Sequence, residues 1–208
     1  MYLFNRTSSV DRLRQLEGFG AAIEVAAMVT AKTDLPVSVF GARFGSPLNS
    51  VMWSARYESQ VQMQRAQEQL LADTEYLEWV NTHSELFEVA ASDRLTKIVS
   101  AALAATPKRF YTLLQATAIS GRLGEAMAFG VRAQETTARL TGLATAFGAE
   151  VYGAVGSVVW LTGADSMAEL DAMVALRETN AEYQALLTEA APLFTAGSGV
   201  TSLIEKLN

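Results

Sequence analysis

Hydrophobic and polar positions follow two different periods in the first half of the chain. After a short β-compatible run, Tyr2–Thr7, apolar residues recur at three- and four-residue steps from Ser9 to about Lys32, which predicts an amphipathic helix. Asp34-Leu35-Pro36 ends this pattern, because proline cannot continue a helix. The chain is therefore predicted to begin with a strand and a long helix.

A hairpin is predicted next. Val37–Phe44 and Ser50–Glu58 have the composition of strands, and Gly45-Ser46-Pro47 predicts the turn between them. Ser59 and Gln62 then form a capping box, S-x-x-Q, which is typical of a helix start. A second helical region is therefore expected directly after the hairpin.

This helical region is expected to break near Asp73 and to restart, because Tyr76, Trp79 and His83 share one helical face. Leu95–Ser100 predicts a final strand. The order strand, helix, strand, strand, helix, strand is that of the split βαβ arrangement, in which two helices cover one face of a four-stranded antiparallel sheet.

The second half of the chain predicts the same order. Its expected strands are Arg109–Ala118, Leu143–Val151, Ser157–Thr162 and Val200–Leu207, and its expected helical regions are Gly121–Thr141 and Ser166–Ala191. The halves also resemble each other in sequence. Phe40–Trp53, FGARFGSPLNSVMW, returns as Phe147–Trp160, FGAEVYGAVGSVVW, without a gap and with six of fourteen positions identical. An internal repeat of this kind predicts two copies of one structural unit.

The offset between the copies defines the predicted boundaries. It is 107 residues downstream, where Ser59 matches Ser166, and 110 upstream, where Arg12 matches Arg122, which predicts three extra residues in the first copy between helix and strand. We predict a first unit at 1–101, a linker at 102–108 and a second unit at 109–208. The predicted fold is α+β, with two tandem ferredoxin-like βαββαβ units whose antiparallel sheets pack as an intramolecular α/β barrel.

Side-chain alternation assigns faces to the strands. We assign Trp53 and its alternate neighbours to the helix side, so that Met52, Ser54 and Arg56 face the sheet–sheet interior. In the first strands of the two copies, Leu3, Asn5 and Thr7 align with Leu113, Gln115 and Thr117 and suggest a shared polar lining. The predicted ligand-binding residues are Arg56, Ser54, Gln115, Thr7 and Thr117.

Two short motifs carry a family resemblance. The run Trp53-Ser54-Ala55-Arg56-Tyr57-Glu58-Ser59 and the later Asp73-Thr74-Glu75-Tyr76 resemble the dimeric α/β-barrel superfamily, and most of all its NIPSNAP-type members. The resemblance implies ferredoxin-like units that form a barrel, here as a fused dimer on one chain. The second copy departs from the pattern, because Gly163-Ala164-Asp165 stands where the first has Arg56-Tyr57-Glu58.

Composition narrows the function classes. The net charge of −6 and pI near 4.9 argue against a nucleic-acid partner, which needs a cationic face. The longest apolar tract, Phe19–Ala31, contains Glu24 and is shorter than the roughly 20 residues that span a bilayer, so no membrane partner is expected. The absence of cysteine excludes disulfides and thiolate sites, no metal-binding motif occurs, and no signal peptide is visible. We therefore expect a cytoplasmic protein.

His83 is the only histidine and a candidate for chemistry. It would serve as a general base or an axial haem ligand, or it is a hydrogen-bonded or partly exposed helix histidine, which is the simpler interpretation. Some members of the resembled superfamily degrade haem, or oxidise aromatic substrates without a metal, through Asn, Trp and His. The resemblance therefore implies Asn5, Trp79 and His83 as catalytic candidates, although Trp79 and His83 are closer together than in that pattern.

Three functions follow from these observations. The leading hypothesis is a small-molecule-binding protein for an apolar or aromatic molecule, without an assured enzymatic activity. The alternatives are a cofactor-independent monooxygenase or haem-binding enzyme with its site in the first half, and a scaffold protein with a packed barrel. No cofactor is required, haem is the one that the resemblance adds, and association into a homo-oligomer is compatible with each hypothesis.

Overall fold

The structure is a computed structural model that describes residues 1–88, 91–104 and 106–208 of the 208-residue chain. Part of the predicted linker 102–108, namely residue 105, lies outside the described residues. The elements are β1 (Tyr2–Ser9), α1 (Gln15–Thr33), β2 (Val37–Phe44), β3 (Ser50–Tyr57), α2 (Gln60–Leu71), α3 (Thr74–His83), a 3-10 turn η1 (Ser84–Leu86), β4 (Ser92–Ala102), β5 (Phe110–Thr117), α4 (Leu123–Thr141), β6 (Ala144–Tyr152), β7 (Ser157–Ala164), α5 (Met167–Thr179), α6 (Ala181–Ala190) and β8 (Val200–Lys206).

The predicted α+β fold is confirmed. The described residues form six α-helices and eight strands, which pair in the closed order β1-β3-β2-β8-β5-β7-β6-β4 of an antiparallel barrel. The expected helix break is present, because Asp73 caps the start of α3. The helical region predicted at Ser166–Ala191 is also divided, because Asn180 caps the start of α6. The first helix begins at Gln15 rather than near Ser9, because Ser9 still belongs to β1. None of the described helices has the length and apolar character needed to cross a bilayer.

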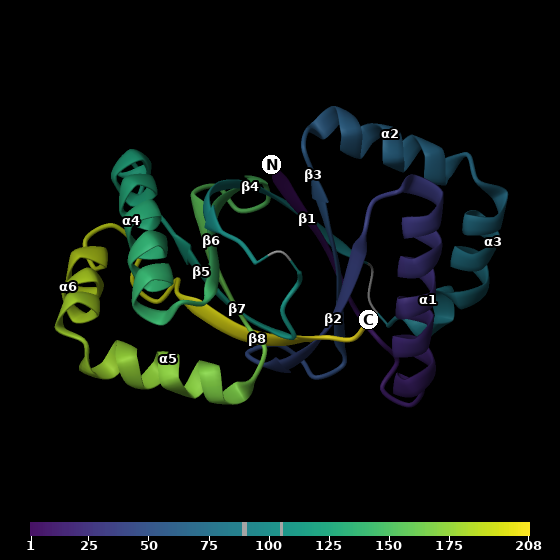
Figure 1. Cartoon of the computed structure of the whole chain (residues 1–208). Helices are drawn as coiled ribbons and strands as arrows, with labels where there is room; N and C mark the ends of the chain where they lie inside the picture. The colour runs from purple at the N-terminus through teal and green to yellow at the C-terminus, as the bar shows by residue number, and fades with distance from the viewer. Residues whose placement is uncertain (89–90, 105) are drawn as a thin grey trace. The chain divides into compact units, whose positions relative to one another are not determined.

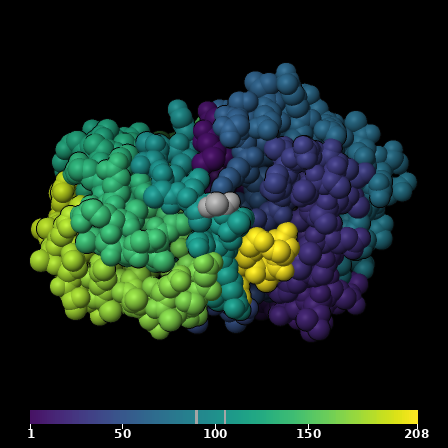
Figure 2. All heavy atoms as spheres, viewed as in Figure 1, coloured from purple at the N-terminus to yellow at the C-terminus, as the bar shows by residue number. Residues whose placement is uncertain are grey.

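The first compact unit comprises Met1–Leu95 and Glu205–Asn208. Its strand β3 lies between β1 and β2, and α1, α2 and α3 cover one face of this sheet (Figure 1). The indole Nε1 of Trp53 donates to the carbonyl of Ala22 in α1 at 2.9 Å, which confirms the predicted helix side of β3. Figure 2 shows the C-terminal residues in yellow against the purple and blue atoms of this unit, where Leu207 N–H donates to the carbonyl of Val39 at 2.8 Å.

The second compact unit comprises Thr96–Ile204. Its strand β7 lies between β5 and β6, and α4, α5 and α6 belong to the same unit (Figure 1). The indole of Trp160 donates to the carbonyl of Gly130 in α4 at 3.1 Å, as Trp53 does in the first unit. The two compact units divide β4 and β8 internally, whereas the boundaries predicted from sequence keep each of these strands almost entirely within one half.

Strand register corrects the alignment of the two hairpins. Trp53 pairs with Val39 and Trp160 pairs with Phe147, so Phe147 occupies the position of Val39 and not that of Phe40. The turn between β2 and β3 is one residue longer than the turn between β6 and β7. The offset is therefore 108 residues before this turn and 107 after it, and the ungapped match was wrong over its first part.

The upstream offset of 110 was also wrong. Arg14 and Arg122 are the N-cap residues of α1 and α4, and they lie 108 residues apart. The same offset relates Tyr2 to Phe110 at the start of β1 and β5. No extra residues separate helix and strand in the first half, because Asp34 and Gly142 end the two helices at the same offset of 108.

In the first unit, a glycine of α1 contacts a large residue that directly follows β1. A Cβ added to Gly18 of α1 would collide with the side chain of the fully buried Val10. Ala126 and Ala118 occupy these positions in the second unit, where they belong to one core cluster. The helix residue is thus a glycine where the residue after the strand is large, and an alanine where that residue is small.

A second contact, one turn further along the helix, shows the opposite exchange, with the glycine and the large residue in the second unit. Ala22 and Val39 belong to one core cluster in the first unit. Gly130 and Phe147 occupy these positions in the second unit, and a Cβ added to Gly130 would collide with the ring of Phe147. Because protein interiors are close-packed, each helix fits the strands of its own unit and not those of the other.

Candidate functional site

The first unit encloses a cavity of 580 Å³ between the helix-covered face of its sheet and helices α1, α2 and α3. Its wall is mostly apolar, and six aromatic side chains contribute to it: Phe4, Trp53, Tyr57, Tyr76, Trp79 and Phe87. Trp53 contacts Phe87 with ring centroids 5.6 Å apart, and Phe4 meets Tyr57 edge to face at 6.4 Å. The cavity is therefore a space bounded by aromatic faces and edges.

Polar groups gather around Arg6 in the cavity wall. The guanidinium of Arg6 binds Asp93 through two hydrogen bonds of 2.8 and 2.7 Å, and these raise the pKa of Arg6. Burial raises the pKa of Tyr57, against the opposing effect of Arg6, so Tyr57 is a neutral phenol at neutral pH. Because Asp93 balances the charge of Arg6, this part of the wall offers a phenol and a compensated cation.

An ion-pair cluster fixes the start of α3 against α1. Lys32 Nζ lies 2.8 Å from both Asp73 Oδ2 and Glu75 Oε2, and Asp73 also accepts from the backbone N–H of Tyr76 at 2.8 Å. The hydrogen bond from Lys32 lowers the pKa of Asp73 below its ordinary value. The cluster sets the position of the helix that carries Tyr76 and Trp79 into the cavity wall.

Trp79 and His83, two of the predicted catalytic residues, lie together. Their rings stack with centroids 4.3 Å apart and planes 14° apart, and His83 Nδ1 lies 2.9 Å from the carbonyl oxygen of Trp79. The indole of Trp79 donates to Glu24 at 3.0 Å. Trp79 lines the cavity, whereas His83 is not among the described residues of its wall. His83 therefore lies behind the wall, stacked on Trp79.

Asn5, the third predicted catalytic residue, lies on the other face of the sheet. It pairs with Ser54 in the register of β1 and β3, whereas its neighbours Phe4 and Arg6 line the cavity. Its Oδ1 is buried and has no hydrogen-bond partner among the described residues. The structure does not bring Asn5, Trp79 and His83 together around this cavity, and their joint catalytic role stays a prediction.

The predicted ligand-binding residues are dispersed. Ser54 contributes to the edge of the first cavity, Thr7 pairs with Met52, and the exposed Arg56 pairs with Leu3. Gln115 and Thr117 alternate along β5 with Leu114 and Ala116, which line a cavity in the second unit. By register Thr7 corresponds to Gln115 and Asn5 to Leu113, which corrects the predicted pairing of Asn5 with Gln115.

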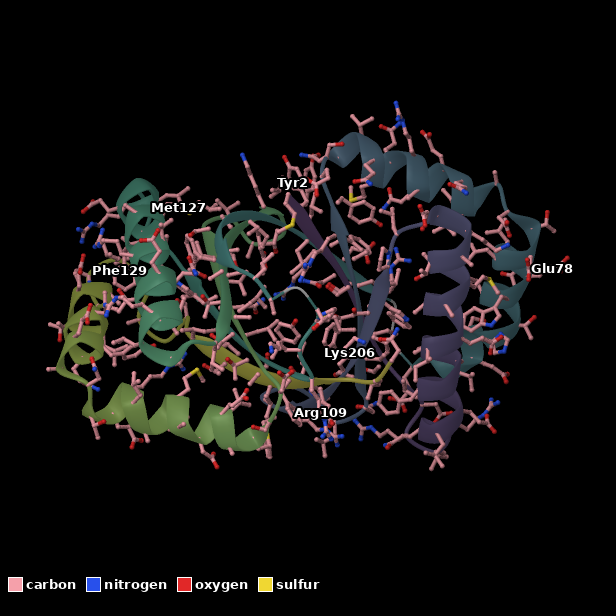
Figure 3. All side chains as sticks on the ribbon, viewed as in Figure 1. Tyr2, Glu78, Arg109, Met127, Phe129 and Lys206 are labelled. Carbon is pink, nitrogen blue, oxygen red and sulfur yellow. The ribbon has the colours of Figure 1, made fainter. Side chains whose placement is uncertain are left out.

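The second unit encloses a cavity of 410 Å³ at the equivalent place. Phe129, on the side of α4 that faces α6, meets Trp160 and Phe194 edge to face, with ring centroids 6.4 and 5.8 Å apart (Figure 3). Leu186 of α6 stands in the wall where the first unit has Trp79. The second cavity is therefore smaller and less aromatic.

Four wall positions on α1, β2 and β3 become polar at the equivalent places of the second unit. Ala26, Val29, Val37 and Ala55 of the first cavity correspond to Gln134, Thr137, Thr145 and Thr162 of the second. All four polar side chains are buried. Gln134 Nε2 donates to Thr145 at 2.7 Å, and Gln134 Oε1 accepts from Ser100 at 2.6 Å, so a hydrogen-bond network replaces an aliphatic wall.

Sequence reasoning missed Arg177, which lines the second cavity from α5. It corresponds to Leu70, because the capping serines Ser59 and Ser166 fix the same offset of 107 at the starts of α2 and α5. The guanidinium carbon of Arg177 lies 5.4 Å from the ring centroid of Tyr183. The sequence signal for this residue was a cation, Arg177, at the position where the other matched helix has the apolar Leu70.

No family model and no curated protein sequence matches the chain. Solved structures are similar in fold at low identity. A protein of Fusobacterium nucleatum proposed to be a monooxygenase has a TM-score of 0.76 and 8% identity, over 100% of this chain and 92% of its own. Another such protein, from Lactobacillus acidophilus, gives 0.70 and 9% over 99% and 93%. The chlorite dismutase of Candidatus Nitrospira defluvii, solved with imidazole, gives 0.54 and 8% over 98% and 90%. The chain therefore has the fold of dimeric α/β-barrel proteins.

Proposed function

We propose that the chain binds a small apolar or aromatic molecule in the cavity of the first unit. The observation that carries this proposal is a cavity of 580 Å³ whose mostly apolar wall includes six aromatic side chains. Cavities of about 300 to 1,000 Å³ with mostly apolar walls are typical of small-molecule sites. Aromatic walls favour flat, π-rich ligands, because rings gain from stacked and edge-to-face contacts.

The polar part of the wall favours a ligand without net charge. Asp93 compensates Arg6, and Tyr57 is a neutral phenol that donates or accepts one hydrogen bond. A neutral aromatic molecule with one hydroxyl or carbonyl group matches these features. An anion would compete with Asp93 for Arg6.

A naphthalene-sized neutral probe, 2-naphthol, tests this proposal. The three tryptophans give three indole N–H signals, of which Trp53 and Trp79 lie in the first cavity and Trp160 in the second. We expect 2-naphthol to shift the Trp53 and Trp79 signals of the ¹⁵N-labelled protein. Trp79→Leu, which introduces the residue found at position 186, should weaken binding about three- to tenfold. Unchanged Trp53 and Trp79 signals at millimolar probe would refute the proposal.

A second candidate is a cofactor-independent monooxygenase that oxidises the bound aromatic molecule with O₂. Two similar structures belong to proteins proposed to be monooxygenases, and Trp79 joins the cavity wall to His83. Under this candidate Trp79 contacts the substrate and His83 supports it from behind, whereas Asn5 faces away from this cavity. Oxygen consumption with a hydroxylated polycyclic aromatic substrate, compared between wild type and His83→Ala, tests it.

The described residues do not fit a haem ligated by His83 inside this cavity. His83 is not part of the described wall, and its Nδ1 contacts the carbonyl oxygen of Trp79. The scaffold hypothesis, which depends on a packed barrel, stays a prediction.

The two halves share their helix caps and strand tryptophans. We propose that the chain arose by tandem duplication of a NIPSNAP-like unit, which the matched Trp53 and Trp160, and the capping residues Ser59 and Ser166, support. A cytoplasmic location, self-association into a homo-oligomer and the lack of nucleic-acid and membrane partners stay predictions from composition.

A further inference from the structure

We infer that the cavity of the second unit is a separate site for an apolar molecule that carries a carboxylate, with Arg177 as the group that binds the carboxylate. This site differs from the proposed site of the first unit in its place and in the charge of its ligand.

Arg177 presents a cation to this cavity without a described anionic partner. Its Nε is buried and has no hydrogen-bond partner, and its guanidinium lies over the ring of Tyr183. Two acidic side chains of α6 are engaged elsewhere, because Glu182 pairs with Arg139 and Glu189 with Arg132. A buried N–H without an acceptor is unfavourable, so an anionic ligand would complete this arrangement.

A carboxylate is the anion that matches Arg177. A planar guanidinium donates two parallel hydrogen bonds to the two oxygens of a carboxylate, and that of Arg177 lies over the ring of Tyr183. Gln134, the other large polar side chain in this wall, is already bonded at both ends to Thr145 and Ser100. Arg177 is therefore the group in the described wall best suited to bind an anion.

The remaining wall suits an apolar body. Phe129, Trp160, Leu186 and Phe194 pack together in one partly and fully buried cluster along the cavity. The volume of 410 Å³ accommodates a medium-sized aromatic or aliphatic acid. The ligand class is thus an amphipathic carboxylic acid.

The first cavity does not offer the same anchor. The position of Arg177 is occupied there by Leu70, and the guanidinium in that wall, Arg6, already binds Asp93. A carboxylate ligand should therefore prefer the second cavity, whereas a neutral ligand of the same shape should show no such preference.

Two isosteric probes test the inference on the full chain: 2-naphthoate and its neutral amide, 2-naphthamide. The indole signal of Trp160 reports the second cavity, and the signals of Trp53 and Trp79 report the first. We expect 2-naphthoate to shift Trp160 with an affinity about tenfold or more above that of the amide. Arg177→Leu, which introduces the residue found at position 70, should remove this preference and leave amide binding within about twofold.

Each outcome is decisive. Equal affinities of acid and amide at Trp160 in the wild type would overturn the inference without any variant. A shift of Trp53 and Trp79 by the acid, with Trp160 unchanged, would also overturn it and would place the acid in the first cavity. A dispersed Trp160 indole signal in the ligand-free variant shows that the second unit folds, and Arg177→Lys, which keeps the charge but lacks the fork, should retain part of the preference. Failure of the first-cavity proposal affects only the 2-naphthol titration, so the two failures are distinguishable.

Discussion

The two cavities occupy the same place in two similar units, yet their walls differ in chemistry. In the first, an aliphatic and aromatic wall surrounds a cation that Asp93 compensates. In the second, four buried polar residues and Arg177 stand at equivalent positions. The hydrogen bond from the indole of a strand tryptophan to a carbonyl of the long helix is present in both units. The residues that line the cavity can therefore change while the contacts between helices and sheet stay the same.

The largest expected difference concerns the core beside the second cavity. Phe147→Ala should lower the free energy of unfolding by about 3–5 kcal/mol, because it leaves a cavity around a fully buried ring that lies 5.0 Å from Trp160. Val39→Ala, at the equivalent position, removes less volume and should cost less. Urea unfolding of both variants gives the comparison, and an equal or larger loss for Val39→Ala would contradict it.

The helix partner of Phe147 gives the next effect. Gly130→Ala should lower the free energy of unfolding by about 1–3 kcal/mol through overpacking, although alanine has the higher helix propensity. Adding Phe147→Val restores the small-to-small combination of Ala22 and Val39, so the double variant should lose less than the sum of the single variants. A double-mutant cycle measures this coupling. Strict additivity would show that the two residues do not constrain each other.

A charge introduced into the first cavity should change its ligand preference. Leu70→Arg places a guanidinium where the second unit has Arg177, and the first cavity should then bind 2-naphthoate about tenfold more tightly than the wild type does. The Trp53 and Trp79 indole signals measure this affinity, and Leu70→Met is the matched neutral control. If the arginine and methionine variants bind the acid equally, a cation at this position is not what selects it.

The smallest effect is a difference in acid stability. The pKa of Asp73 in the folded chain lies below 3.8, because Lys32 donates to it, so its stabilising contribution is present above about pH 5 and is lost as the pH falls through the folded pKa. Asp73→Asn keeps the helix cap, as Asn180 does in the second unit, and removes the titration. Urea unfolding at pH 5 and pH 3 should show a smaller acid loss for the variant. An identical loss in both proteins would assign the acid sensitivity to other groups.

The fold followed from local signals that do not depend on distant contacts. The hydroxyl groups of Ser59 and Ser166 accept from the backbone N–H groups of Gln62 and Glu169, as expected of helix caps. Asp73 caps a new helix, also as expected. The equivalence of the hairpin residues could not be predicted in this way. Phe40 and Phe147 are identical, but they occupy different register positions, because the two hairpin turns differ in length by one residue. Strand pairing is set by contacts across the sheet, which similarity along one strand does not reveal.

The candidate site was predicted only in part, for a related reason. Trp79 reached a cavity wall, but Asn5 belongs to the opposite sheet face by the same alternation that placed Trp53 against α1. Arg177 was missed because a lone arginine on a helix is usually a solvated residue, and its significance lies in what the other unit has at that position. Arg177 became recognisable when it was compared with Leu70, the residue at the equivalent position of the first unit.

The reciprocal glycine contacts also restrict the order in which substitutions can accumulate. Phenylalanine at position 147 is best accommodated when position 130 is already glycine, because the methyl group of an alanine there would overlap the ring. Once the ring is present, alanine at position 130 carries the overpacking cost given above. The same holds for Gly18 and Val10 in the other half. Exchanging a single helix between the halves, by recombination or in protein engineering, should therefore cost stability that a transplant of the helix together with its strands avoids.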